Sequence, residues 1–596
     1  MKERELRGLI EDVRVGKLSR RDFVRRMLAV GLTAPFATQM LSYSGIAMAA
    51  SLPEYKPTQR GGGGHLRLLW WQGPTLLNPH FAVGTKDQDG SRLFYEPLAA
   101  WDADGNLVPI LAAEIPSLEN GGLAEDGMSV TWKLKQGVQW HDGEPFTADD
   151  CVFNWEYATD PETAAVTIGS YQDSKAVKVD DHTVRVEFEK PTPFWADAFV
   201  GTRGMLIPKH LFEEFKGAAS RDAPANLAPV GTGPYLFEEF NPGDLVRGKL
   251  NPNYHEENRP HFDSIEMKGG GDAVSAARAV LQTGEFDYAW NMQVEDELLS
   301  RLEEAGKGKI VIAETGHIEH IQVNNTDPRK EVDGERSSTE TQHPFLTDPA
   351  VRQALNLLVD RGSVEQHIYG RTGPATANFL NNPEKFRSEK TSYEFDVQKA
   401  VALLEEGGWV PGADGIREKD GVRLSLVYQT SINAPRQKTQ AIVKQACQKA
   451  GIEVELKSVT ASVFFSSDVG NPDTYTKFYS DIQMYTTTMT QPDPGIFMNQ
   501  FVSWEIATKA NKWQGRNITR WNSSEYDELY REAQGELDPV KRAALFIRMN
   551  ELLVENVVVI PIVSRPNVAA VASNLSAPLS GWDNYTWALK DWYRDA

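Results

Sequence analysis

The stretch Trp132–Asp150 reads WKLKQGVQWHDGEPFTADD and contains the end of a strand, two turns and the start of a helix. The overlapping segment Ser129–Lys135 alternates apolar and polar residues, which is typical of a half-buried strand. Gly137 and Gly143 indicate turns, because glycine adopts backbone conformations that other residues avoid. Thr147, followed after one residue by two aspartates, predicts a capped helix N-terminus. This stretch therefore predicts a strand followed closely by a helix.

Strands and helices also alternate along the rest of the chain. Short apolar or alternating segments predict strands, and segments with apolar residues on one face predict helices. Pro53–Gly64, with its run of four glycines, is typical of a flexible leader. No internal repeat is visible. The sequence thus indicates an α/β or mixed α+β protein with several sheets, with strands expected at 65–71, 182–188 and 452–456 and helices at 274–281, 348–361, 397–406, 436–450 and 538–555.

Composition excludes several classes of protein. The 596 residues leave room for several domains. The net charge of −21 would repel a phosphate backbone, so we expect no nucleic-acid partner. Cys151 and Cys447 are the two cysteines, too few for a disulfide-rich scaffold, a thiolate zinc site or an iron–sulfur cluster.

Residues 1–50 have the features of an export signal. A basic region precedes an uncharged stretch that ends at the small-x-small site Ala47–Ala49. Within it, Ser19–Val24 (SRRDFV) resembles the twin-arginine motif, which directs export of folded proteins. A membrane anchor is the alternative, but Met27–Met40 is interrupted by glycine and proline and is shorter than the roughly 20 apolar residues of a span. The fifty residues hold nine Lys/Arg and five Asp/Glu, so the remaining chain carries −25.

A search for catalytic or metal-binding patterns yields none. His317 and His320 form the closest histidine pair, and on a strand this odd spacing points the rings to opposite faces. The glycine run Lys268–Asp272 lacks the Gly-Lys-Ser/Thr of a phosphate loop, and no Gly-x-Ser-x-Gly nucleophile elbow is present. We therefore expect no catalytic residue, no metal and no cofactor. Among the many aromatic residues, some are expected to line a cleft for an organic ligand.

The stretch Trp132–Asp150 resembles the hallmark segment of extracytoplasmic solute-binding proteins of family 5, the oligopeptide- and dipeptide-binding type. The resemblance covers nearly the whole chain after the signal region. Turn geometry accounts for several of the matching glycines and prolines, so the hallmark marks the scaffold more than ligand contacts. Further matching segments are Phe94–Leu98, Ile207–His210, Val230–Tyr235, Asn251–Tyr254, Thr283–Asp287, Asp348–Leu355 and Ala450–Val454.

The resemblance implies a two-lobed periplasmic-binding-protein fold of mixed α/β type, with an extra subdomain on the first lobe. Ligand enclosed between the lobes contacts both of them only when they are closed, so it shifts a hinge equilibrium toward closure. The implied division is 51–91, 206–316 and 560–596 for the first lobe, 92–205 for the subdomain and 317–559 for the second lobe.

The resemblance also implies which segments face the ligand. They are the early loop 81–85, the interlobe strand around two histidines, and the segment 484–491. The candidate ligand-binding residues are Phe81, Val83, Gly84, Thr85, His317, His320, Met484, Thr487, Thr488 and Thr490.

Thr490 departs from the family pattern. Peptide-binding members place an aspartate four residues before the proline that matches Pro494, where it pairs with the α-amino group of the ligand. A threonine hydroxyl cannot supply that charge-assisted bond, worth about 1.5–3 kcal/mol. Asp493 either substitutes for it or belongs to the following turn. The expected ligand is therefore a peptide, an opine-like conjugate or a short oligosaccharide.

The sequence predicts a monomeric periplasmic binding protein, peripheral to the membrane, that delivers its ligand to the permease subunits of an ABC importer. Two alternatives stay open at this point. A secreted hydrolase would fit the size, the export signal and the aromatic content, and a periplasmic chaperone or sensor would use the same cleft for a protein partner.

Overall fold

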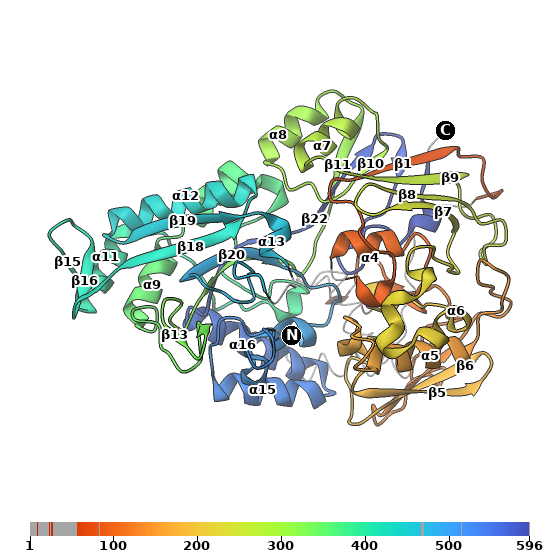
Figure 1. Cartoon of the computed structure of the whole chain (residues 1–596), viewed down its shortest axis with the longest axis horizontal. Helices are drawn as coiled ribbons and strands as arrows, with labels where there is room; N and C mark the ends of the chain where they lie inside the picture. Colours follow the sequence, from red (N-terminus) through yellow and green to blue (C-terminus); the bar gives the residue numbers. More distant parts are fainter. Residues whose placement is uncertain are drawn as a thin grey trace.

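The computed structural model describes residues 57–82, 84–466, 470–513 and 515–594, and positions 9, 23, 26 and 27 before them. The remainder of the predicted export signal lies outside the described residues. Figure 1 shows two units side by side, each built on a large mixed sheet and connected by chain segments that cross between them. In these described ranges, none of the helices combines the length and apolar character needed to cross a bilayer.

The right-hand unit of Figure 1 is built on a seven-stranded sheet, here the seven-stranded unit. Its strand β1 pairs in parallel with β9 and β10, whereas the other neighbours are antiparallel. The predicted strand at 65–71 is confirmed as β1. In spatial order the sheet comprises β11 (Gly308–Ala313), β22 (Asn567–Ala572), β10 (Tyr288–Ala289), β1 (His65–Trp70), β9 (Ser264–Gly269), β8 (Leu245–Leu250) and β7 (Tyr235–Asn241).

The left-hand unit contains a five-stranded sheet and is called the five-stranded unit. Strand β18 pairs in parallel with β19 and β20, and β12 pairs antiparallel with β20 and β21. The predicted division assigned residues from 560 onward to the first lobe, but β21 reaches Ser564 within this second sheet. The spatial order is β19 (Glu453–Val459), β18 (Ser425–Ser431), β20 (Ile482–Thr487), β12 (Ile318–Val323) and β21 (Val559–Ser564).

A three-stranded sheet and helix α5 (Ala148–Thr159) contain the two ends of the stretch Trp132–Asp150. The sheet order is β4 (Ser129–Lys133), β6 (Thr183–Phe188) and β5 (Ser174–Asp180). Thr147 caps α5: its side chain accepts from the amide of Asp149, and Asp150 accepts from the amide of Thr147. The predicted strand and capped helix are both confirmed.

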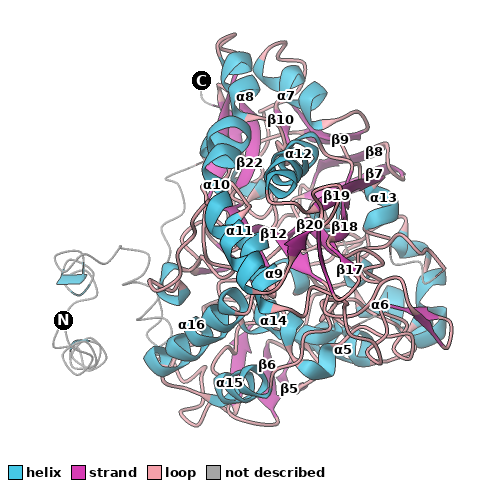
Figure 2. Ribbon diagram, turned by 90° about the vertical axis from the view of Figure 1, so that its left-hand side faces the viewer, coloured by secondary structure: helices cyan, strands magenta, loops and turns pink. Residues whose placement is uncertain are grey.

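Helices cover the sheets on the outside. Figure 2 shows α9, α11 and α12 on the outer side of the five-stranded unit, where they bury residues such as Leu355, Leu404 and Val443 in one apolar cluster. Helices α7 and α8 pack similarly on the seven-stranded sheet. The helices are α4 (Thr85–Ser91), α6 (Lys209–Phe212), α7 (Ala273–Leu281), α8 (Asp296–Glu303), α9 (Pro349–Leu357), α10 (Arg361–Val364), α11 (Val397–Glu406), α12 (Ala434–Lys449), α13 (Ala461–Phe464), α14 (Gly495–Met498), α15 (Ser524–Gly535) and α16 (Pro539–Glu555).

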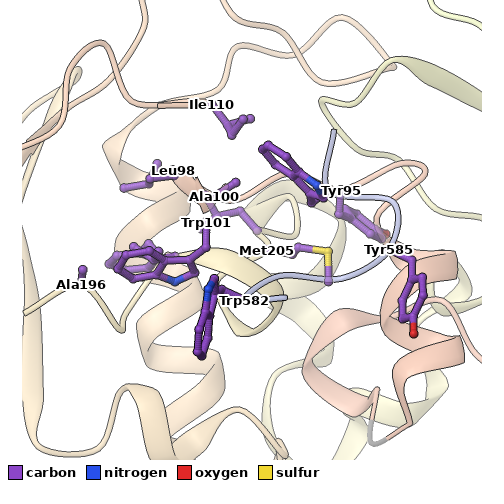
Figure 3. Close-up of a cluster of buried hydrophobic side chains, with 14 of the residues drawn as sticks. Tyr95, Leu98, Ala100, Trp101, Ile110, Ala196, Met205, Trp582 and Tyr585 are labelled. Atoms are coloured by element: carbon purple, nitrogen blue, oxygen red, sulfur yellow. The ribbon is translucent and has the colours of Figure 1, made fainter. Parts of the chain in front are cut away.

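The C-terminal segment joins the seven-stranded unit to the region around the three-stranded sheet. Figure 3 shows Trp582 and Tyr585 among buried side chains of residues 95–205, including Trp101 and Met205. Asp583 fixes this contact, because its carboxylate accepts from the amide of Trp101 at 3.0 Å. The remaining short strands are β2 (Ala99–Trp101), β3 (Leu107–Pro109), β13 (Glu331–Val332), β14 (Glu335–Arg336), β15 (Val410–Pro411), β16 (Arg417–Lys419), β17 (Val422–Arg423), β23 (Leu575–Ser576) and β24 (Tyr593–Arg594).

Two local predictions were wrong. The single helix expected at 348–361 is interrupted after Leu357, because Asp360 caps a new helix by accepting from the amide of Ser363. The end of the predicted flexible leader is held in place: the amides of Gly62 and Gly64 donate to the carboxylate of Asp263 at 2.8 and 2.9 Å.

Gly231, within the family-like segment Val230–Tyr235, lies against the backbone of Phe94. A Cβ atom there would lie 1.8 Å from the carbonyl oxygen of Phe94. We expect Gly231→Ala to lower the free energy of unfolding by about 2–3 kcal/mol, because backbone cannot move aside as a side chain can. Urea denaturation measures the loss. Gly169→Ala is the control, since an added Cβ there meets nothing within 4 Å; equal stability losses would contradict the argument.

Candidate functional site

The carboxyl ends of parallel strands from the two sheets face one another. Just beyond β18, Asn433 donates from Nδ2 to Oε1 of Gln293 beyond β10, at 2.8 Å. The ammonium group of Lys438 pairs with Glu295 at 2.7 Å. In open α/β sheets, ligands bind outside the carboxyl ends of the strands. The interface between these two sheet edges is therefore the candidate ligand site.

Two chain segments cross between the sheets at the base of this interface. One leads from β11 to β12 and the other from β21 to β22. They are hydrogen-bonded where they cross: the amide of Arg565 donates to the carbonyl of His317 at 3.0 Å, and Oγ1 of Thr315 donates to the carbonyl of Arg565 at 2.6 Å. Short paired connections of this kind can serve as a hinge between two units.

His317 contacts the segment that follows β20. The amide of Met489 donates to Nδ1 of His317 at 3.0 Å, and Gly316 approaches so closely that a Cβ there would lie 2.5 Å from Sδ of Met489. Burial, together with the charge of Arg565, lowers the pKa of His317 to about 3. The ring is therefore neutral at pH 7, as an acceptor at Nδ1 must be. Two of the predicted ligand-facing segments thus meet here.

A buried ion pair lies at the same edge of the five-stranded sheet. Nε of Arg436, in the first turn of α12, donates to Oε1 of Glu319 in β12 at 2.9 Å, and Thr486 also donates to this carboxylate. Both charged side chains are almost fully buried. Burial alone would raise the pKa of Glu319, but the charges of Arg436 and Arg565 and these hydrogen bonds hold it below its ordinary value. Glu319 is therefore ionised and already paired.

Aromatic and apolar side chains flank the interface. Trp71 and Trp290, at the carboxyl ends of β1 and β10, have ring centroids 5.4 Å apart, and Nε1 of Trp71 donates to the carbonyl of Trp290. On the five-stranded side, Ile432 and Phe465 are 56% and 43% exposed. Surfaces of this kind suit contact with the apolar parts of an organic ligand.

The first predicted ligand segment lies beside α4. Phe81 is buried, with the guanidinium carbon of Arg221 3.5 Å from its ring centroid. Gly84 is the N-cap residue of α4 and Thr85 is its first residue, both partly exposed. Val83 lies outside the described residues.

The other predicted residues differ in exposure. His320 and Met484 are fully buried: His320 contacts the rings of Phe379 and Tyr485, and Met484 belongs to the core beneath α12. Thr488 is exposed, whereas Thr487 and Thr490 are partly buried. These five residues come from three parts of the chain: β12, β20 and the segment after β20.

Asp493 belongs to the turn that follows. It accepts from the amide of Gly495 at 2.8 Å and pairs with the guanidinium of Arg542. The two side chains are buried. This carboxylate is therefore neutralised by the protein itself, and it does not replace the aspartate that the family pattern places at position 490.

Three charged residues of the interface did not follow from the sequence: Glu319, Arg436 and Arg565. Glu319 lies between His317 and His320 in the sequence. Its ion pair with Arg436, 117 positions later, forms only because α12 packs near β12. Among the residues that the structure describes, no group of three His, Cys, Asp or Glu side chains is arranged to hold a metal ion.

Comparison with known proteins agrees with this arrangement. The profile of the bacterial extracellular solute-binding proteins, family 5 Middle, matches residues 106–509, which is more than half of the chain. The chain belongs to this family. Family 5 proteins bind solutes for transport and are not enzymes, so the family membership also accounts for a chain without a recognisable catalytic pattern.

Individual family 5 relatives are distant in sequence. The oligopeptide-binding protein AppA of Bacillus subtilis is 27% identical over 471 residues, covering 77% of this chain and 79% of AppA. The glutathione-binding protein GsiB of Shigella boydii is 24% identical over 517 residues, covering 84% of this chain and 89% of GsiB.

Solved structures share the fold. The structure of AppA from Bacillus subtilis with a nonapeptide aligns with a TM-score of 0.73 at 23% identity, over 91% of this chain and 100% of that one. NikZ of Campylobacter jejuni with Ni(L-His) gives a TM-score of 0.73 at 22% identity, over 89% and 99%. The mixed α/β fold is therefore that of the periplasmic binding proteins.

Proposed function

We propose that this family 5 protein captures a polar organic solute of peptide size between its two units and delivers it to the permease of an ABC importer. The observation that carries the proposal is the pair of opposed carboxyl sheet edges, connected by crossing segments at Thr315–His317 and Arg565. A solute bound between the edges contacts both units, so its binding energy favours the state in which they are closed.

The named relatives guide the choice of solute class. AppA is an oligopeptide-binding protein and GsiB a glutathione-binding protein, so peptides and peptide-like conjugates are the first class to examine. Thr490 argues against a free α-amino group as the main anchor, and this is why opine-like conjugates and short oligosaccharides stay in the proposal.

The two units act as two lobes in this proposal. The first lobe contains residues 51–91, 206–316 and the chain beyond the second crossing, residues 92–205 form a subdomain on it, and the second lobe begins at residue 317. We place the solute against Gly84, Thr85, His317, Thr487, Thr488 and Thr490. Phe81, His320 and Met484, which were also predicted to face the solute, are buried in the protein.

The proposal includes export as a folded protein. The motif Ser19–Val24 resembles a twin-arginine signal, and removal of residues 1–50 would leave an acidic chain in the periplasm. There the protein acts as a monomer, peripheral to the membrane, and meets the permease in its solute-bound form.

The experiment that tests this function is mass spectrometry of small molecules released from the purified protein, followed by a thermal-shift screen of peptides and oligosaccharides. At 100 times its Kd, a solute should stabilise the protein by about 2.7 kcal/mol. The proposal predicts that the solute is recovered chemically intact. Turnover of the solute, or no shift with any class, would contradict it.

Position 490 provides a gain-of-function prediction. We expect Thr490→Asp to increase the affinity for trialanine, relative to N-acetyl-trialanine, about 10-fold, because a carboxylate supplies a charge-assisted bond to an ammonium group. Isothermal titration calorimetry measures the two affinities. Thr490→Asn is the control, since it has the same shape without the charge; an equal change in both variants would contradict the role of position 490.

A further inference from the structure

Arg565 lies at the point where the chain crosses from the second sheet to the first. It is between β21 and β22, and its backbone is held on both sides by residues 315 and 317. Its charge acts on groups of both units: it lowers the pKa of Tyr369 and of Tyr585 relative to what burial alone would give. The side chain therefore lies between the two units, at the base of the candidate site.

The guanidinium of Arg565 has no hydrogen-bond acceptor among the residues that the structure describes. The residue is only 7% exposed, yet among the described residues its side chain makes no hydrogen bond and no ion pair within 4.0 Å; its contact is the ring of Tyr369, 4.9 Å from the guanidinium carbon. Two other buried arginines do have acceptors: Arg436 pairs with Glu319, and Arg361 donates to the carbonyl of Pro561. A buried charge without a partner is costly, and such side chains are rare outside functional sites.

The charged groups around Arg565 sum to one positive charge. Glu319 is neutralised by Arg436, with which it shares a close ion pair, and it lies beyond ion-pair distance of Arg565. His317 is neutral, and burial keeps Tyr369 and Tyr585 in their neutral forms.

On the seven-stranded side, Asp89 is the carboxyl group that acts on Tyr585. Burial raises the pKa of Asp89 to about 8, even though Trp70 and Tyr585 donate to it. It is mostly protonated at pH 7 and does not offset the arginine. A protein with a net charge of −21 thus holds a local positive charge at the base of its binding interface.

We propose that Arg565 binds a carboxylate of the solute, so that this protein selects anionic organic solutes. The planar guanidinium offers parallel N–H donors that match the two oxygens of a carboxylate, and it lies over the ring of Tyr369. The inference rests on the proposed function and narrows it: the anchoring charge of the solute is negative, at a site whose family-pattern aspartate is replaced by Thr490. Acidic conjugates and peptides recognised at their C-terminus meet this requirement, whereas neutral oligosaccharides do not.

The test compares N-acetyl-trialanine with its C-terminal amide, which lacks the carboxylate but is otherwise the same. Calorimetry on the ligand-stripped protein should give about 10- to 100-fold tighter binding of the acid. Arg565→Gln should bind the two compounds equally, and Arg565→Lys should keep part of the preference. Arg301→Gln is the control, because Arg301 is an exposed arginine in a single-turn pair with Glu297.

A structural role for Arg565 predicts something different. Arg565→Gln would then lower the melting temperature of the ligand-free protein, whereas removal of an unpaired buried charge should leave it unchanged or raise it. Preference for the acid in Arg565→Gln, or equal binding of both compounds by the unaltered protein, would overturn the proposal. If the protein bound only trialanine amide, which has a free amino group and no carboxylate, the anion anchor would be overturned. The solute-binding function would remain intact.

If neither compound binds, negative-ion mass spectrometry of co-purified molecules decides. A carboxylic acid retained by the unaltered protein and lost from Arg565→Gln supports the proposal. A retained molecule without an acidic group overturns the anion anchor but not solute binding. If no molecule is bound and no solute produces a response, both the anion anchor and the solute-binding function are overturned.

Discussion

Arg436→Met is expected to lower the free energy of unfolding by about 3–5 kcal/mol, because it leaves Glu319 buried without its partner. Both side chains are almost fully buried, and Nε of Arg436 lies 2.9 Å from Oε1 of Glu319. Thr486 alone would then hold the carboxylate by a hydrogen bond. Chemical denaturation of the purified variant at pH 7 measures the loss.

The double variant Glu319→Gln/Arg436→Met provides the control. It removes both charges, and replacing a buried pair by neutral groups costs much less than breaking it. We therefore expect the double variant to recover most of the lost stability. A loss below about 1 kcal/mol in Arg436→Met, or equal losses in the single and double variants, would show that the pair does not stabilise this edge of the sheet.

The buried histidines are expected to lower stability as the pH falls from 6.5 to 4, and Asp89, whose pKa is raised to about 8, offsets part of this loss. Burial lowers the pKa of His80, His141 and His320 to about 4 from an ordinary value of 6.5. Between these values the unfolded chain binds protons that the folded protein does not. Within this window, each histidine therefore lowers the free energy of unfolding by about 1.4 kcal/mol for every unit by which the pH falls. Above pH 6.5 this loss is absent. Denaturation at intervals from pH 7 to 4 measures the slope.

His320→Phe tests one of these contributions. The ring of His320 contacts Phe379 and Tyr485, and its Nε2 has no hydrogen-bond partner among the described residues, so phenylalanine should replace it in the core. The slope should decrease by about 1.4 kcal/mol per pH unit. An unchanged slope would mean that His320 is not kept neutral in the folded protein.

Much of the secondary structure followed from local sequence. Alternating residues and Thr147 predicted β4 and α5 because strand periodicity and helix capping act over a few residues. The break before α10 was missed, although Asp360 and Ser363 have the spacing of a helix cap. The glycines at 61–64 were misread because the acceptor that holds them, Asp263, lies some 200 residues further along the chain.

The site could be predicted only as segments. The resemblance indicated the loops that approach the interface, but it did not separate buried Met484 from exposed Thr488, since Met484 lies within β20 in the core of the five-stranded unit and Thr488 lies just beyond the end of that strand. Arg565 gave no local signal. Its significance comes from the pairing of the two crossing segments, from the neutralisation of Glu319 by Arg436, and from Tyr369, none of which is visible in the residues next to it.

We expect this chain to close around an intact solute. Small-angle scattering of the ligand-stripped protein, before and after adding back the molecules released from it by denaturation, tests this claim most directly. The radius of gyration should decrease on loading, because the bound state is the closed one. Saturating binding with no change in the radius of gyration would contradict it.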